Sequence, residues 1–214
     1  NRDTDARNNL WRAVAYACHP DAWGVQIVFD NKVILGTRAR KTRTKSFNAF
    51  SSIDYPETAM FRDRRLIQFL QRPAEYTHAV FSTALDPNVF VLRLVPGMRA
   101  DIIPMLEGRY RALVLESFGV GGLPGGDDGA MFAAVRDWCG AGHLAVFTTQ
   151  VPHEGSDLAV YEVGRAAKAL PGVLEAHDMT PEATAVKLMW VLGQTTDRAE
   201  AEKLFLTPVQ WDIL

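Results

Sequence analysis

The sequence predicts an α/β fold in which parallel strands form a sheet with helices on both faces. Two observations lead to this prediction. From residue 89 onward, four short apolar runs alternate with segments whose apolar residues recur at helical spacing, an order typical of a parallel sheet covered by helices. One of these runs ends in a glycine-rich loop, residues 119–126, before a helix-like segment. Strand, glycine loop and helix in that order bring backbone N–H groups to the carboxyl edge of a sheet.

The first part of the chain predicts one helix and one hairpin. Residues 8–18 carry apolar side chains at helical spacing and stop before His19-Pro20, so we expect a helix there. The β-branched run 24–29 predicts a strand, and residues 33–35 return as its hairpin partner after a turn. Residues 36–45 are polar and basic, and residues 51–86 show no strong period. We expect the latter to form a connector with some local structure.

Beyond this connector the predicted elements alternate regularly. We expect strands at residues 89–94, 112–115, 144–148 and 173–174, and helices at residues 100–106, 130–139, 158–170 and 181–192. Thr180 is the predicted N-cap of the last helix, because its side-chain oxygen can accept from an N–H of the first turn and Pro181 suits the first helical position. These elements divide the chain into a first domain (1–70), a linker (71–86) and a second domain (87–214).

Composition excludes several classes of function. The chain has 214 residues, a hydrophobic content of 48% and a net charge of −2, so neither a nucleic acid nor an anionic membrane is an expected partner. Its two cysteines, Cys18 and Cys139, form no disulfide framework and indicate a reducing, cytoplasmic environment. No apolar run approaches the ~18 residues of a membrane span. Metal binding is not predicted, because no histidine has ligand spacing to another or to a cysteine; the histidines are His19, His78, His143, His153 and His177.

A basic run places five cations within eight residues: Arg38, Arg40, Lys41, Arg43 and Lys45. One interpretation is a solvated loop, and the lack of interleaved aromatic residues does not favour nucleic-acid binding. The other interpretation is that one lysine points inward, where a desolvated amine among other cations has a depressed pKa and can take or relay a proton. Lys41 is the candidate for that role, because it is central in the run and follows the hairpin.

A second polar loop, with Thr149 and Gln150, follows the predicted strand 144–148. Since the carboxyl ends of neighbouring parallel strands share one crevice, we expect these side chains to lie near Gly121 and Gly122. A hydroxyl and an amide suit a small polar ligand, and helix capping is the alternative of equal weight. The glycine spacing does not match the dinucleotide fingerprint, so nucleotide binding is not favoured.

Several segments resemble, in order and spacing, the type I (cytoplasmic) bacterial L-asparaginases. They are residues 115–124, the Thr-Thr-Gln loop at 148–150, residues 161–164 and residues 178–183. In addition, residues 36–50 resemble the lysine region of that family, and residues 5–10 resemble its Asp-Gly/Ala-x-x-Asn-Leu segment. The resemblance covers nearly the whole chain.

The resemblance implies a two-domain enzyme that hydrolyses L-asparagine to L-aspartate and ammonia without a metal or cofactor, as a homodimer or homotetramer. Residues 1–70 then form the back part of an N-terminal catalytic domain, and residues 87–214 a small α/β domain. The family uses a threonine nucleophile, served by a second threonine, an aspartate and a lysine that corresponds to Lys41. Both threonines and the aspartate would precede Asn1. We therefore expect this chain to be inactive alone and to work with an N-terminal segment.

The resemblance also assigns residues at the carboxyl edge of the second domain. Gly121, Gly122, Thr149, Gln150 and Glu154 are expected to contact the substrate or a neighbouring subunit. Two alternatives remain open. One is the glutamine-amide hydrolysing subunit of a tRNA amidotransferase, and the other is a non-catalytic module whose glycine loop holds a small ligand.

Overall fold

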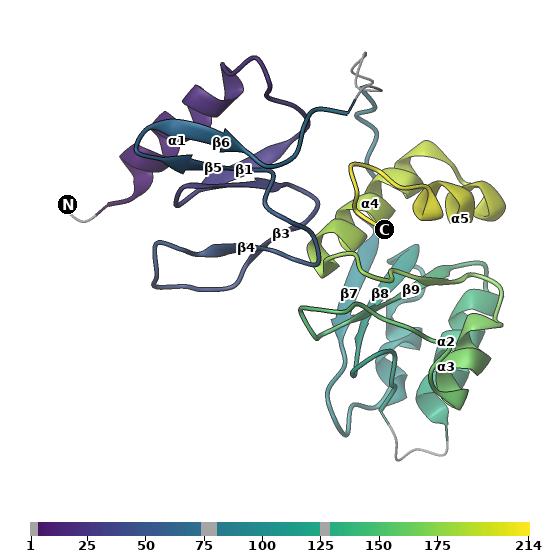
Figure 1. Cartoon of the computed structure of the whole chain (residues 1–214). Helices are drawn as coiled ribbons and strands as arrows, with labels where there is room; N and C mark the ends of the chain where they lie inside the picture. The colour runs from purple at the N-terminus through teal and green to yellow at the C-terminus, as the bar shows by residue number, and fades with distance from the viewer. Residues whose placement is uncertain (1–3, 74–80, 125–128) are drawn as a thin grey trace. The chain divides into compact units, whose positions relative to one another are not determined.

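The chain divides into two compact units, Asn1–Ser82 and Thr83–Leu214, which are described separately below. The computed structural model describes residues 4–73, 81–124 and 129–214, and Figure 1 shows its helices and strands. Gly125 and Gly126 of the predicted glycine loop, and His78, lie outside the described residues. Within the described ranges, no helix combines the length and apolar character needed to cross a bilayer.

The first unit begins with helix α1 (Ala6–Ala17) and continues into an antiparallel hairpin of β1 (Gln26–Phe29) and β2 (Lys32–Leu35). The predicted helix and hairpin are thus confirmed. Asp30 and Asn31 close the hairpin with φ angles of 44° and 71°. Both central positions of a tight hairpin turn of this kind need positive φ, which Asp and Asn tolerate better than most residues.

The predicted connector over residues 51–86 is more regular than the expected local structure, because residues 50–68 form further strands. Strand β4 (Phe50–Ser52) pairs with β3 (Ala39–Lys41) from the basic stretch, and β5 (Ala59–Arg62) forms a hairpin with β6 (Arg65–Gln68). The larger sheet has the order β1-β2-β5-β6 and is antiparallel. These strands of three or four residues are too short to show a period, and the Asp63-Arg64 turn lacks the glycine that usually marks a hairpin.

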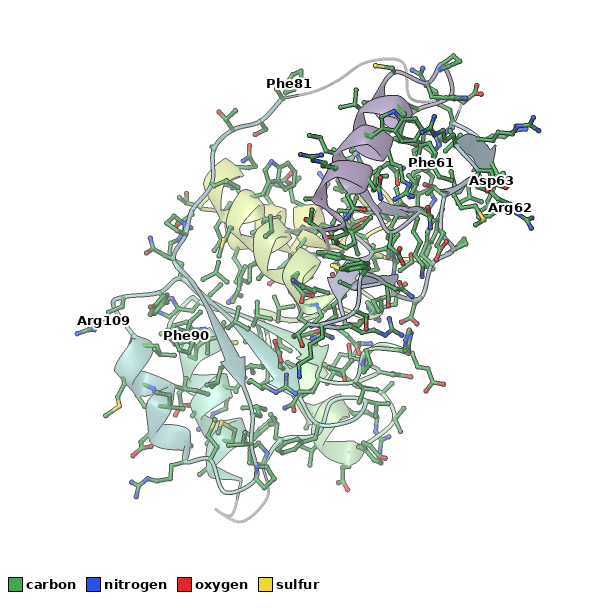
Figure 2. All side chains as sticks on the ribbon, turned by 90° about the vertical axis from the view of Figure 1, so that its left-hand side faces the viewer. Phe61, Arg62, Asp63, Phe81, Phe90 and Arg109 are labelled. Carbon is green, nitrogen blue, oxygen red and sulfur yellow. The ribbon has the colours of Figure 1, made fainter. Side chains whose placement is uncertain are left out.

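A small apolar core holds the first unit together. Tyr16 of α1 packs with Val33, Ala59 and Phe61 from three positions on the sheet. The ring of Trp11 meets Phe61 edge to face, with ring centroids 6.0 Å apart. Figure 2 labels Phe61. The core therefore joins the predicted helix to β2, which was predicted, and to β5, which was not.

The second unit contains the predicted parallel sheet, in the order β10-β9-β8-β7. Its strands are β7 (Val89–Arg93), β8 (Ala112–Ser117), β9 (Leu144–Thr149) and β10 (Val173–Glu175). β8 and β9 occupy the centre and are buried along their whole length. This explains why their sequences are continuous apolar runs rather than alternating patterns.

Helices cover both faces of this sheet, as predicted (Figure 1). On one face, α4 (Pro181–Gln194) and α5 (Arg198–Leu206) pack on a cluster that includes Val114 and Val146. On the other face, α2 (Ala130–Gly140) and α3 (Glu162–Lys168) pack on a second cluster. This cluster contains the residues of β8 and β9 that alternate with Val114 and Val146, namely Leu113, Leu115 and Phe147. The predicted N-cap of α4 is also confirmed, because the hydroxyl oxygen of Thr180 accepts from the N–H of Ala183 at 3.1 Å.

The helix predicted at residues 100–106 is instead a pair of short 3₁₀ helices, Ala100–Ile102 and Pro104–Leu106. Pro104 explains the difference, because proline has no N–H to donate and its ring clashes with the preceding helical turn. Residues 158–170 also differ, since α3 begins only at Glu162. The N–H of Leu158 donates to the carboxylate of Glu175 instead of joining a helix.

Helix α5 was not predicted. Its N-cap is Asp197, whose carboxylate accepts from the N–H of Glu200 at 2.8 Å. Asp-x-x-Glu is close to the capping-box pattern that opens many helices, so this was the local signal that would have identified the helix.

Candidate functional site

The predicted glycine loop forms a tight turn directly after β8. The N–H of Phe118 donates to the carbonyl of Gly122 at 3.0 Å, and the N–H of Gly122 donates back to Phe118 at 2.7 Å. Gly121 has a φ of 148°, and a Cβ at this position would lie 2.6 Å from Cδ2 of Leu158. Leu158 is itself only 1% exposed. Gly121 is thus required by the packing of the turn. A Cβ added at Gly122 would lie 3.3 Å and 3.4 Å from two atoms of Phe118, which is tight but not a clash, and the φ of Gly122 is ordinary.

We expect Gly121→Ala to lower the free energy of unfolding of the second unit by roughly 1–3 kcal/mol, because the added methyl group overpacks a closed core and strains the backbone. The matched control is Gly140→Ala at the end of α2, where a Cβ would meet nothing within 4 Å. That substitution is expected to be neutral or slightly stabilising, since alanine favours helices. Urea unfolding of both variants tests the difference, and equal midpoints would contradict it.

Thr149 and Gln150 bind the strand ends together. The Thr149 hydroxyl donates to the carbonyl of Gly119 at 2.5 Å and accepts from the N–H of Val151 at 3.0 Å. The Gln150 amide donates to the carbonyls of Leu94 and Glu116, at 2.6 and 2.8 Å. The two polar side chains therefore connect the loops after β7, β8 and β9. In these contacts the hydroxyl and the amide stabilise the strand ends, which differs from the helix-capping alternative; the role in ligand binding stays a prediction.

Glu154 lies in the loop over residues 151–158, which connects β9 to α3. The loop is held from two sides, because the N–H of Asp157 donates to Val120 of the glycine turn at 2.8 Å and the N–H of Ser156 donates to His177 after β10 at 2.9 Å. Glu154 itself is exposed and has a φ of 76°. The structure therefore places Glu154 on the accessible part of a loop that the carboxyl edge of the sheet supports.

In the first unit, the inward-facing cation of the basic run is Arg38 and not Lys41. Arg38 is fully buried, with its guanidinium carbon 5.7 Å from the centre of the Tyr55 ring. Lys41 is exposed at the end of β3, opposite Phe50. The expectation of an inward lysine is thus wrong for the described residues. Arg38 cannot replace Lys41 as a base, because a guanidinium does not lose its proton in proteins.

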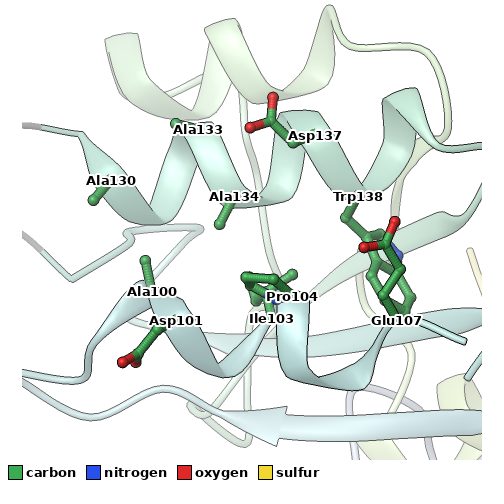
Figure 3. Close-up of a pocket in the computed structure, with 10 residues that line it drawn as sticks. All are labelled: Ala100, Asp101, Ile103, Pro104, Glu107, Ala130, Ala133, Ala134, Asp137 and Trp138. Atoms are coloured by element: carbon green, nitrogen blue, oxygen red, sulfur yellow. The ribbon is translucent and has the colours of Figure 1, made fainter. Parts of the chain in front are cut away.

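A cavity of about 370 Å³ lies between the 3₁₀ helices and α2 (Figure 3). Carboxylates surround its apolar floor, but Asp101 pairs with Arg99 and Asp137 pairs with Arg136, each at 2.9 Å. None of the predicted site residues lines this cavity; its lining residues are Ala100, Asp101, Ile103, Pro104, Glu107, Ala130, Ala133, Ala134, Asp137 and Trp138. The candidate site therefore consists of the loops at the carboxyl edge and not of this cavity.

Glu175, the last residue of β10, is a further polar residue at this edge and was not among the predicted site residues. Its side chain is 3% exposed and contacts both the 151–158 loop and α3. The only signal in the sequence was its place at the carboxyl end of a predicted strand. Among the described residues, no group of three or more His, Cys, Asp or Glu side chains is arranged to hold a metal ion.

Comparison with known proteins matches both units to one family. The model named "Asparaginase, N-terminal" matches residues 1–75, and the model named "Glutaminase/Asparaginase C-terminal domain" matches residues 88–205. An L-asparaginase from Thermococcus kodakarensis is 37% identical over 203 residues, which are 94% of this chain. A glutamyl-tRNA(Gln) amidotransferase subunit from Metallosphaera sedula is 33% identical over 80% of this chain.

Solved structures agree with this assignment. The thermostable L-asparaginase from Thermococcus kodakarensis superposes with a TM-score of 0.90 over 99% of this chain, at 34% identity, and L-asparaginase I from Vibrio cholerae with a TM-score of 0.84, at 25% identity. This chain spans only part of the length of its relatives. It covers 63% and 64% of the two solved chains. In the sequence comparison it covers 60% of the Thermococcus kodakarensis L-asparaginase and 39% of the amidotransferase subunit. Both the sequence and the fold therefore show that the chain belongs to the glutaminase/asparaginase family.

Proposed function

We propose that this chain is part of an L-asparaginase that hydrolyses L-asparagine to L-aspartate and ammonia. The observation that carries the proposal is the 37% identity to an L-asparaginase over 94% of the chain, which extends through both units. The relatives named as amidotransferase subunits are less similar, at 33% identity over 80% of the chain for the protein from Metallosphaera sedula. Asparagine is therefore the first substrate to test.

The proposed mechanism uses a threonine hydroxyl as the nucleophile and Lys41 as the group that handles its proton. A hydroxyl is a weak nucleophile at its ordinary pKa and needs a base next to it. This chain covers 60% of the L-asparaginase from Thermococcus kodakarensis, and the proposal places the threonine in the part of the enzyme that corresponds to the remainder. A lysine acts as a base only when neutral, and desolvation favours the neutral form. Since Lys41 is exposed in this structure, the proposal requires the segment that supplies the threonine also to cover Lys41.

The proposed assembly is a homodimer or homotetramer in the cytoplasm. Its support is the exposed position of Glu154 on a loop that the sheet edge supports, where a carboxylate is accessible to a neighbouring protomer. The site beneath that loop would then be lined by Gly121, Gly122, Thr149 and Gln150. Cys18 and Cys139 are both free thiols, which is consistent with a reducing compartment.

Ammonia release from L-asparagine and L-glutamine tests the proposed function. The assay compares the intact polypeptide with the isolated 214-residue chain. We expect the intact polypeptide to release ammonia from asparagine faster than from glutamine, and the isolated chain to release none, because the proposal places the nucleophile outside it. Absence of asparagine hydrolysis by the intact polypeptide would overturn the proposal.

The same ammonia-release assay tests the second candidate function, that of the glutamine-hydrolysing component of a tRNA amidotransferase. The observation in its favour is the similarity to several proteins named as subunits of glutamyl-tRNA(Gln) amidotransferases. That candidate predicts ammonia release from glutamine in preference to asparagine.

A further inference from the structure

We propose that Glu175 is a positioning residue, which holds the 151–158 loop at the carboxyl edge of the parallel sheet so that the loop can bind substrate. This inference rests on the proposed function, because it assigns that loop a role in asparagine binding. Glu175 does not itself touch the substrate. It acts through the loop to which its carboxylate is bonded.

The carboxylate of Glu175 joins three elements. Its Oε1 accepts from the backbone N–H of Leu158 at 2.7 Å, and its Oε2 lies 2.9 Å from Nζ of Lys168. Leu158 ends the loop, Lys168 ends α3, and Glu175 ends β10. The strand end, the loop end and the helix end are therefore connected through one side chain.

Leu158 transmits this restraint to the glycine turn. Its side chain is 1% exposed and fills the space where Gly121 has no Cβ. The preceding residue, Asp157, donates its N–H to the carbonyl of Val120 in the same turn at 2.8 Å. Fixing the backbone at Leu158 therefore also fixes the distance between the loop and the turn after β8.

The segment after β10 supports the loop a second time. The N–H of Ser156 donates to the carbonyl of His177 at 2.9 Å, and a Cβ on Gly155 would lie 2.6 Å from that carbonyl oxygen. The backbone two residues after Glu175 thus holds Ser156 by a hydrogen bond and leaves no room for a side chain at position 155. Glu154 is exposed and directly precedes these anchored residues, so the position of Glu154 depends on how residues 155–158 are held.

A buried charge at this place is unnecessary for packing alone. Burying a carboxylate is costly unless cations and N–H donors compensate it, and an apolar side chain would fill the same volume without that cost. Glu175 instead has an N–H donor, the ammonium of Lys168, and Nδ1 of His177 at 3.9 Å. Charge-assisted hydrogen bonds of this kind have stricter geometry than apolar contacts, which is what fixing a loop requires.

The test is the Michaelis–Menten kinetics of Glu175→Ala and Glu175→Gln in the intact polypeptide with L-asparagine. For Glu175→Ala, we expect KM to rise roughly tenfold to a hundredfold, the factor that corresponds to losing a hydrogen bond to a charged group, while kcat changes much less. Glu175→Gln keeps an oxygen for the N–H of Leu158 but loses the charge opposite Lys168, so it should partly restore KM. The control is Glu200→Ala, which removes an exposed carboxylate from a pair with Lys203 on α5.

Hydrogen exchange provides a second readout of the same variants. We expect Glu175→Ala to speed exchange at the N–H groups of Asp157 and Leu158 while the N–H groups of β8 stay protected. An unchanged KM, or an equal loss of protection throughout β8, would overturn the positioning role. If the wild-type protein does not hydrolyse asparagine, the proposed function fails; if it does and KM is unchanged in Glu175→Ala, only the role of Glu175 fails.

Discussion

Lys41→Met is expected to lower the kcat for asparagine in the intact polypeptide by about 10²–10⁴-fold, the range that a positioned acid or base contributes. Methionine keeps the length and the apolar stem of lysine but cannot accept or donate the proton of a nucleophilic hydroxyl. The loss should appear mainly in kcat, because the proposal gives Lys41 a role in the chemical step. Steady-state ammonia release measures it.

The fold should tolerate this change, because the place of Lys41 in β3 depends on backbone pairing with Phe50. Thermal unfolding of the variant should therefore match the wild type. Lys45→Met is the matched control, since it removes the same charge from another exposed position of the basic run and should leave kcat nearly unchanged. Near-normal turnover of Lys41→Met would remove Lys41 from the mechanism, and equal losses in both variants would indicate a general effect of charge.

The second unit was largely predictable because its strands and helices leave local patterns in the sequence. β8 and β9 are buried on both faces, so each begins with four consecutive apolar residues. The apolar residues of the helices between the strands recur at helical spacing. The first unit was less predictable. β4, β5 and β6 have only three or four residues each, which is too few to show a period. In addition, β5 pairs with the distant strand β2, and pairing of that kind leaves no local pattern.

The candidate site was predictable in its location but not in its contacts. Because parallel strands end at one edge, the order of the elements was enough to bring Thr149 to the glycine turn, where its hydroxyl bonds Gly119. The sequence could not tell which polar atoms stay available, and the Gln150 amide turned out to bond two carbonyl groups. Nor could it tell that Arg38 rather than a lysine is buried, because burial depends on the tertiary packing around Tyr55.

Lys187 forms a buried ion pair whose disruption should strongly destabilise the second unit. It lies on α4, with its Nζ 2.8 Å from Oδ2 of Asp212, and the two side chains are 5% and 4% exposed. Nζ also donates to the carbonyl of Thr207 at 2.8 Å and lies 5.6 Å from the centre of the Phe205 ring. Burial lowers the pKa of Lys187, and the hydrogen bond and negative charge of Asp212 oppose that shift.

We expect Lys187→Met to lower the free energy of unfolding of this unit by roughly 3–5 kcal/mol, because it leaves the charge of Asp212 buried without a neighbouring cation. Native-state hydrogen exchange of the β8 N–H groups measures this loss. Lys203→Met, which removes an exposed ion pair with Glu200, should cost less than about 1 kcal/mol.

The double variant Lys187→Met/Asp212→Asn identifies the cause of the loss. The carboxylate of Asp212 accepts a hydrogen bond from the N–H of Val209 at 2.7 Å. Asparagine at this position removes the negative charge but keeps an oxygen that can accept this hydrogen bond. If the uncompensated charge is what destabilises the single variant, the double variant should be more stable than the single one, even though it carries one more substitution. If the double variant is no more stable, the lost contacts of Lys187 to Thr207 and Phe205 account for the loss, and the ion pair contributes little.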